Sequence, residues 1–101
     1  MVQGTTPTFT LTLPDTIDLE EASHVYFTMR QGSAIVTIDQ SDMDLEGNIA
    51  VVYLSQSDTV RFSRSTDAEI QLNWTYSDGS RACTDIKKIP VTENLLKEVL
   101  V

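Results

Sequence analysis

Residues 69–76 read Glu-Ile-Gln-Leu-Asn-Trp-Thr-Tyr and alternate between polar and apolar side chains without interruption. Asp78 and Gly79 follow almost at once, and another run begins at Arg81. Period-two alternation that leads into an Asp-Gly turn is a strong sequence signal for a β-hairpin. The stretch therefore predicts two antiparallel strands, over residues 68–76 and 81–91, joined by a turn at 77–80.

The rest of the chain repeats this pattern of short runs separated by turn residues. Five further strands are expected, at residues 8–13, 24–30, 34–39, 43–45 and 49–54. A change of phase among the apolar positions of residues 81–91 predicts a β-bulge in the second arm of the hairpin. The number and spacing of the runs predict an all-β protein, an immunoglobulin-like antiparallel β-sandwich of about seven strands.

Two Asp/Ser caps predict short helical turns between the strands. Asp18 is followed three residues later by Glu21, and Ser55 is followed by Asp58, which is the spacing of a capping box. The length of 101 residues suits a single domain over residues 1–101, with a flexible leader at 1–7 and an apolar tail at 93–101.

One face of each alternating strand is expected to form the core. The uninterrupted apolar run at residues 49–54 favours a central strand that is covered on both faces. The predicted core residues are Phe9, Leu11, Val25, Phe27, Ile38, Ile49, Val51, Ile70, Leu72 and Trp74.

The charge of the chain argues against several classes of partner. The formal net charge is −8, and residues 1–50 carry eight acidic residues against one basic residue, Arg30. Phosphate backbones and anionic membrane surfaces attract basic proteins, so neither nucleic acid nor membrane is expected as a partner. A well-solvated acidic surface and a basic docking partner are the two remaining interpretations.

The compartment is inferred from the single cysteine and from the N-terminal sequence. Cys83 has no second cysteine with which to form an intrachain disulfide, which fits synthesis in a reducing compartment. Residues 1–7 lack the basic and apolar regions of a signal peptide. No apolar run approaches the roughly 20 residues of a membrane-spanning helix.

Several short motifs carry a resemblance to a known family. They lie at residues 6–9, 19–22, 25–28, 31–32, 47–49, 54–56, 78–81 and 88–91, and Thr59 and Phe62 follow the motif at 54–56. In these motifs the chain resembles small structural proteins of tailed phages and prophages of Gram-positive bacteria. Its layout is similar to the immunoglobulin-like N-terminal domain of phage baseplate upper proteins.

The resemblance implies a non-enzymatic virion structural or adaptor protein of the tail, baseplate or head–tail region. It implies synthesis in the cytoplasm of the bacterial host and a final location in the virion. The implied partners are other phage structural proteins or further copies of the chain itself, as a homo-oligomer. The alternative from another class is a β-sandwich module that binds carbohydrate or the host surface.

The loop that begins at Asp42 contains the one metal-binding pattern. Acidic residues at the first, third and fifth positions, Asp42, Asp44 and Glu46, followed by Gly47, match the start of an EF-hand loop. The twelfth position should be a bidentate glutamate, but it is Tyr53, and strands flank the loop, so an EF-hand is excluded. A solvated loop and a weak calcium site formed by the three carboxylates remain as interpretations.

No pattern in the sequence predicts catalysis. His24 and Cys83 are the only histidine and the only thiol, and nothing in the sequence brings them together as a nucleophilic pair. His24 is expected on the surface and Cys83 in the core. Phosphate-binding, zinc-binding and hydrolase motifs are absent from the sequence, so we expect neither enzymatic activity nor a cofactor.

Two groups of apolar side chains are candidates for ligand or partner binding. The aromatic residues Tyr26, Tyr53, Trp74 and Tyr76 could form a sugar-binding platform, although Trp74 is first of all expected in the core. The tail is the predicted interaction segment, through Leu95, Leu96, Val99 and Leu100. It either packs back as a last strand or docks on another subunit, by strand addition or as a short helix in a groove.

Overall fold

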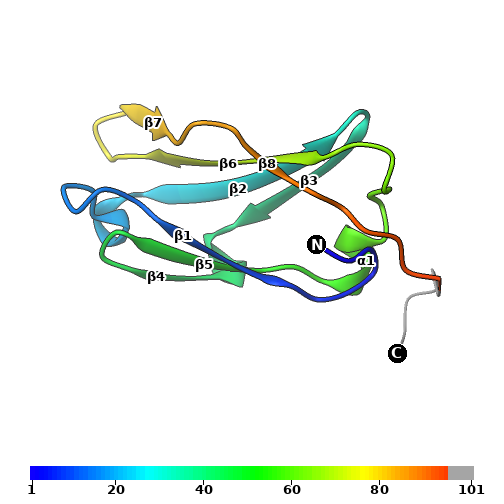
Figure 1. Ribbon diagram of the computed structural model, residues 1–101. Helices are drawn as coiled ribbons and strands as arrows, with labels where there is room; N and C mark the ends of the chain where they lie inside the picture. The colour runs from blue at the N-terminus through cyan, green and yellow to red at the C-terminus, as the bar shows by residue number, and fades with distance from the viewer. Residues whose placement is uncertain (96–101) are drawn as a thin grey trace.

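Two antiparallel sheets pack face to face in the computed structural model, which describes residues 1–95 (Figure 1). The smaller sheet has the order β1 (Thr8–Thr12), β5 (Ile49–Tyr53) and β4 (Met43–Glu46). The larger sheet has the order β3 (Ala34–Asp39), β2 (His24–Gln31), β6 (Ala68–Thr75) and β7 (Arg81–Cys83), and β8 (Lys87–Ile89) also pairs with β6. The prediction of an all-β sandwich is therefore confirmed.

The predicted hairpin is present, and its second arm is divided between β7 and β8. Asn73 pairs with Cys83, and Ile70 pairs with Lys87. Two residues separate the paired positions on β6, whereas three separate them on the other arm, so one extra residue is accommodated near Ile86. This confirms the predicted bulge. Because the bulge splits the arm, residues 1–95 contain eight strands, compared with the expected seven or so.

Both predicted caps begin a short helical turn. The side chain of Asp18 caps the 3-10 helix η1 (Leu19–Glu21). Ser55 and Asp58 form a reciprocal capping box at the start of α1 (Gln56–Thr59). These turns carry the chain from one sheet to a strand of the other, η1 ahead of β2 and α1 ahead of β6.

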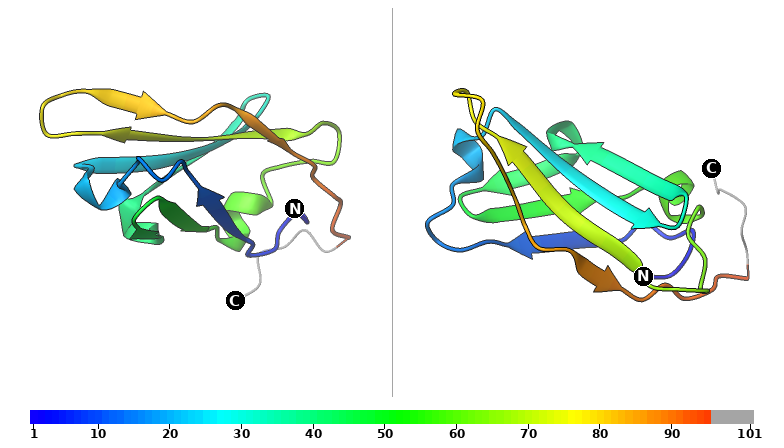
Figure 2. Two further views of the ribbon diagram at one scale, coloured as in Figure 1. Left: turned by 60° about the vertical axis from the view of Figure 1, so that its left-hand side comes forward. Right: turned by 90° about the horizontal axis from the view of Figure 1, so that it is seen from above.

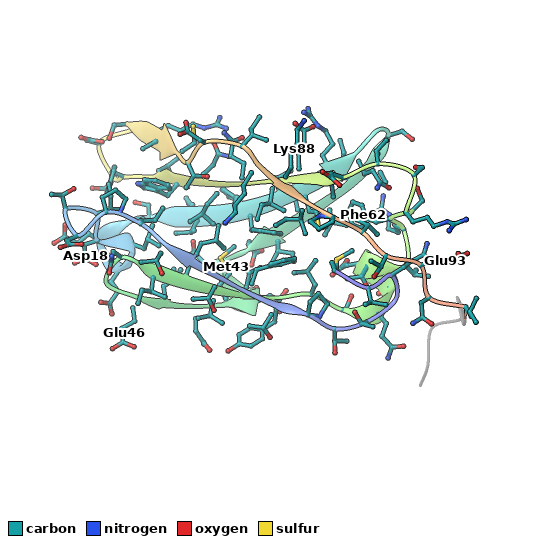
Figure 3. All side chains as sticks on the ribbon, viewed as in Figure 1. Asp18, Met43, Glu46, Phe62, Lys88 and Glu93 are labelled. Carbon is teal, nitrogen blue, oxygen red and sulfur yellow. The ribbon has the colours of Figure 1, made fainter. Side chains whose placement is uncertain are left out.

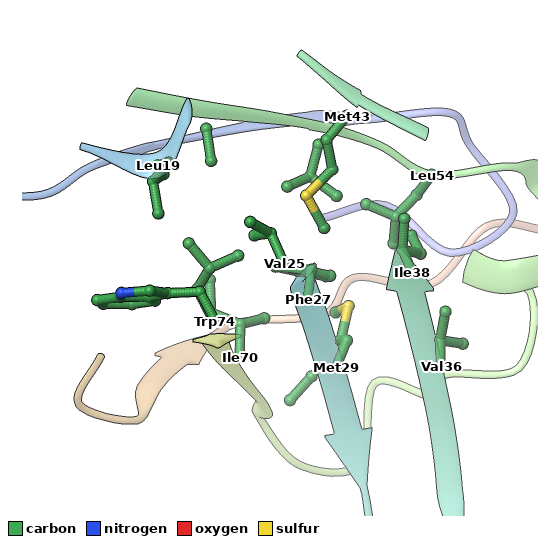
Figure 4. Close-up of a cluster of buried hydrophobic side chains, with 14 of the residues drawn as sticks. Leu19, Val25, Phe27, Met29, Val36, Ile38, Met43, Leu54, Ile70 and Trp74 are labelled. Carbon is green, nitrogen blue, oxygen red and sulfur yellow. The ribbon is translucent and has the colours of Figure 1, made fainter. Parts of the chain in front are cut away.

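The core lies between the two sheets, where side chains of both layers meet (Figure 4). Six of the ten predicted core residues are buried there: Val25, Phe27, Ile38, Ile70, Leu72 and Trp74. Phe9 and Leu11 are only half-buried and pack against the border of this cluster. Their partial exposure reflects an opening along one side of the sandwich.

The two core residues predicted on β5, Ile49 and Val51, were the wrong ones of the alternating set. Ala50 and Val52 are buried, whereas Ile49 faces solvent and Val51 is half-buried. The six consecutive apolar residues at 49–54 carry no period-two signal, and a shift of one residue moves every side chain to the other face. β5 is central within its sheet, but the core covers only one of its faces, so Tyr53 remains 47% exposed on the other.

The N-terminal residues are part of the fold, so the prediction of a flexible leader was also wrong. The backbone N–H of Gln3 donates to the carbonyl of Thr92 over 2.9 Å, and the N–H of Thr92 donates to the carbonyl of Met1 over 2.8 Å. Val2 and Thr92 form a parallel bridge. These bonds to a distant segment, which a local pattern does not reveal, hold residues 1–3 against residues 90–92.

Candidate functional site

The sandwich is open along one side, between β1 and the arm that contains β7 and β8. A groove of about 760 Å³ lies there, and most of its lining is apolar. The side chains that define its walls are Phe9, Leu11, Ile70, Trp74, Ile86 and Ile89. Views from the side and from above show β3 and β8 on opposite edges of the larger sheet, with β1 beneath the β8 side (Figure 2).

The edge of β1 that borders this groove has no strand partner among residues 1–95. β1 pairs with β5 on its other edge. In the same register, the N–H of Leu13 donates to the carbonyl of Asn48 and the N–H of Leu54 donates to the carbonyl of Pro7. Hydrogen-bonded pairs alternate along an antiparallel ladder, so odd-numbered residues of β1 bond to β5. The backbone groups of Thr8, Thr10 and Thr12 therefore point away from β5, toward the open side.

β1 also differs from the other edge strands in charge. β4 carries Asp44 and Glu46, β8 carries Lys87 and Lys88, and β3 ends at Asp39. Charged side chains on an edge strand hinder pairing with a further strand. β1, Thr-Phe-Thr-Leu-Thr, has no charged residue, and it is the one edge strand of the described chain of which this is true.

The three carboxylates of the candidate calcium site are spread along an exposed surface. Asp42 ends the 3-10 helix η2 (Gln40–Asp42), and Asp44 and Glu46 lie on β4. Glu46 points away from the sandwich (Figure 3). Asp44 accepts a hydrogen bond from the hydroxyl of Tyr53 over 2.6 Å, and this bond raises the pKa of the Tyr53 hydroxyl. Within residues 1–95, no group of three or more potential ligands is arranged to hold a metal ion.

His24 and Cys83 do not form a pair. Both are exposed, so the prediction that Cys83 lies in the core was wrong. Cys83 of β7 pairs with Asn73 along one edge of β6. His24 of β2 pairs with Thr75 along the opposite edge of β6. β6 therefore lies between the thiol and the imidazole. Cys83 is exposed because its position in the alternation places it on the outer face, with Asn73.

The four aromatic residues do not share a surface. Trp74 is 3% exposed and donates its indole N–H to the hydroxyl of Tyr76 over 3.1 Å. Tyr26 is exposed on the larger sheet and Tyr53 is exposed on the smaller one. The arrangement gives no flat aromatic platform of the kind that stacks on a sugar ring.

Only the start of the predicted interaction segment falls within the described residues. Leu95 is 94% exposed, which is unusual for a large apolar side chain. Leu96, Val99 and Leu100 lie outside the described residues. The prediction that these residues form an interaction segment therefore stays a prediction.

Comparison with known protein families finds none that matches this chain, and no curated protein matches it. Within residues 1–95, no helix is long and apolar enough to cross a membrane.

The open edge of β1 was not predicted as a site from the sequence. One signal was available, because residues 8–12 combine strict alternation with a complete lack of charge between Pro7 and Pro14. The sequence does not reveal that this strand lies at the edge of its sheet, since edge position follows from the pairing of all the strands. The groove likewise requires the two sheets to be placed over each other.

Proposed function

We propose that this chain is a non-enzymatic structural or adaptor protein that assembles with neighbouring subunits through the open edge of β1. The observation that carries the proposal is the apolar groove of about 760 Å³ beside an unpaired, uncharged strand. An added strand would bond to the free backbone groups of β1. Its alternate side chains would fill the groove between β1 and β8. This is the strand-addition mode of protein recognition.

The order of the strands supports an immunoglobulin-like topology as the finer description of the fold. In immunoglobulin domains one sheet has the order A, B, E, D and the other contains C′, C, F and G. The orders β1-β5-β4 and β3-β2-β6-β7 correspond to B-E-D and C′-C-F-G. In this correspondence the place of strand A, beside β1, is the open position.

The setting that we propose is the virion of a tailed phage or prophage, with other structural proteins or further copies of the chain as partners. Its support is the resemblance of the turn and core motifs described above. The acidic surface is consistent with a partner that is itself a protein, because a net charge of −8 disfavours phosphate-rich surfaces. The groove beside β1 gives a neighbouring protein subunit a surface that it could bind through backbone hydrogen bonds and apolar side chains.

The test is to delete the gene from the phage or prophage that encodes it and to restore it in variant forms. Thr10→Pro removes an N–H that points to the open side and leaves the bonds between β1 and β5 intact, because proline is tolerated at such edge positions. Thr37→Lys, on the exposed face of β3, is the matched control. We expect deletion to reduce infectious particles, wild type and Thr37→Lys to restore them, and Thr10→Pro to fail.

The proposal is contradicted if particles form normally without the gene, or if Thr10→Pro restores them as well as wild type does. A second arm tests the non-enzymatic part of the proposal. The double variant His24→Ala with Cys83→Ser should restore particles fully, because both side chains are exposed and separate. Loss of particles with a folded double variant would favour an enzymatic role instead.

A further inference from the structure

We infer that the strand added to the open edge of β1 is β1 of a second copy, so that two chains join edge to edge around a twofold axis. The inference rests on the proposed function, because it names the partner at the same site. Such a contact would merge the two β1-β5-β4 sheets into one continuous sheet. The same surface patch serves both copies, as closed twofold symmetry requires.

The alternation of threonine and apolar residues in β1 reads the same in both directions, with Phe9 and Leu11 exchanging places. An antiparallel pair centred on Thr10 places Thr8 of one copy opposite Thr12 of the other, and Phe9 opposite Leu11. Thr–Thr pairs on adjacent strands stabilise a sheet, and the Phe9–Leu11 pair removes two apolar side chains from water. The threonines would continue the outer face of the sheet, and Phe9 and Leu11 would face the grooves, where they already line an apolar wall.

The backbone directions agree with this register. The free N–H and C=O groups belong to the even-numbered residues of β1, as its pairing with β5 requires. A twofold axis at Thr10 makes Thr10 a hydrogen-bonded pair with its own equivalent, and it makes Thr8 and Thr12 a second such pair. Every free backbone group along β1 then finds a partner. A register centred on Phe9 or Leu11 would pair Thr10 with Thr8 or with Thr12, and it would leave the third of these threonines without a partner within β1.

The C-terminal segment fits the groove less well than β1 does. As an added strand, residues 95–101 would turn alternate side chains toward the apolar lining. One set contains Lys97 and the other contains Glu98, so either choice brings a charge into the groove. Asp85 and Lys87 border the groove, but most of its lining is apolar, and burial of a charge against an apolar surface is costly. Residues 8–12 present only apolar side chains on one face and only threonine on the other.

Charge also distinguishes β1 from the rest of the surface. Two molecules of net charge −8 repel each other, yet no charged side chain lies on the strands that would meet. The repulsion acts between more distant groups, and salt screens it, with a screening length that falls from about 30 Å at 0.01 M to about 8 Å at 0.15 M. Association through β1 should therefore strengthen as salt rises over this range, whereas association through ion pairs would weaken.

Sedimentation velocity of the purified chain provides the first test. We expect a reversible dimer whose fraction rises with protein concentration and with salt. Thr10→Pro removes two N–H donors per dimer and should raise the dissociation constant by at least about 30-fold. Thr10→Lys places like charges opposite each other at the axis and should do the same. Thr37→Lys should have no effect. Circular dichroism and urea unfolding establish that each variant is folded.

Deletion of residues 95–101 tests whether β1 or the C-terminal tail forms the dimer contact. The dimer should survive this deletion. If the deletion abolishes it and Thr10→Lys does not, the tail carries the association and the inference is wrong. A wild-type chain that stays monomeric from micromolar to millimolar concentration also overturns the inference. It does not overturn the proposed function, which still stands if Thr10→Pro prevents particle formation.

Cysteine cross-linking tests the register itself, in a Cys83→Ser background that removes the exposed native thiol. The Cα atoms of a hydrogen-bonded pair lie about 5.5 Å apart, within the range of a disulfide. Thr10→Cys should form disulfide-linked dimers on mild oxidation. Thr8→Cys and Thr12→Cys should do so only when they are mixed. Equal cross-linking of Thr12→Cys alone would exclude a twofold axis at Thr10.

Discussion

The side-chain amide of Gln3 donates a hydrogen bond to the main-chain carbonyl of Phe62, although 59 residues separate the two in the sequence. Both residues are buried. The bond closes the end of the sandwich, where the N-terminal residues meet the loop after α1. Residues 1–7 therefore belong to the folded structure, and the same end is also held by the backbone bonds that join Thr92 to Gln3 and to Met1.

The first prediction concerns this bond. Gln3→Leu keeps a side chain of similar size but cannot donate, which leaves the carbonyl of Phe62 buried without a partner. We expect the free energy of unfolding to fall by about 1–3 kcal/mol. Urea unfolding measures the change, with the exposed substitution Ser33→Ala as the control. An unchanged midpoint would mean that the N-terminal residues do not stabilise the domain.

The second prediction concerns Trp74, which is 3% exposed. Trp74→Ala leaves a large cavity in the core and should lower the free energy of unfolding by about 3–5 kcal/mol. Trp74→Phe, which keeps a ring but loses the hydrogen bond to Tyr76, should cost less. Guanidinium unfolding of both variants gives the comparison. Nearly unchanged midpoints would place the indole on the surface and favour the sugar-binding alternative.

The third prediction concerns acid stability. The hydroxyl and backbone N–H of Ser41 lower the pKa of Asp39, and those of Ser80 lower the pKa of Asp78. A carboxyl group with a lowered pKa binds its proton less tightly in the folded state than in the unfolded chain. Its contribution to stability is therefore present above the unfolded pKa, near 3.9, and is lost as pH falls through the folded value.

The double variant Asp39→Asn with Asp78→Asn should accordingly lose less stability than wild type between about pH 5 and pH 3. Urea unfolding at a series of pH values measures this slope. Asp15→Asn with Asp67→Asn removes two exposed carboxylates elsewhere and serves as the control. If the control pair flattens the slope as much as the test pair does, the serine hydrogen bonds are not its cause.

The fourth prediction concerns calcium. Asp42, Asp44 and Glu46 lie along an exposed surface, and Asp44 already binds the hydroxyl of Tyr53. We expect millimolar calcium to leave the melting temperature unchanged, since a ligand stabilises a protein only if it binds the folded state preferentially. Calorimetry with and without calcium tests this. A rise of several degrees that disappears in Asp42→Asn with Asp44→Asn would establish a metal site.

Local patterns were sufficient where the side chains alternate. Residues 69–76 predicted β6 and its hairpin, and the phase change after Cys83 predicted the bulge. Ser55 and Asp58 predicted α1 through a capping box that involves only neighbouring residues. These features depend on interactions within a few positions of the chain, so the sequence alone determined them.

Tertiary structure decided the features that depend on distant partners. The apolar run at residues 49–54 contains no alternation, and only its pairing with β1 decided that Val52 faces the core and Val51 does not. Gln3 is buried because Phe62 and Thr92 lie beside it. The uncharged alternation of residues 8–12 was visible in the sequence, but the position of this strand at the edge of a sheet was not. Whether a strand lies at an edge and borders a groove depends on the pairing and stacking of all the strands, which no local pattern specifies.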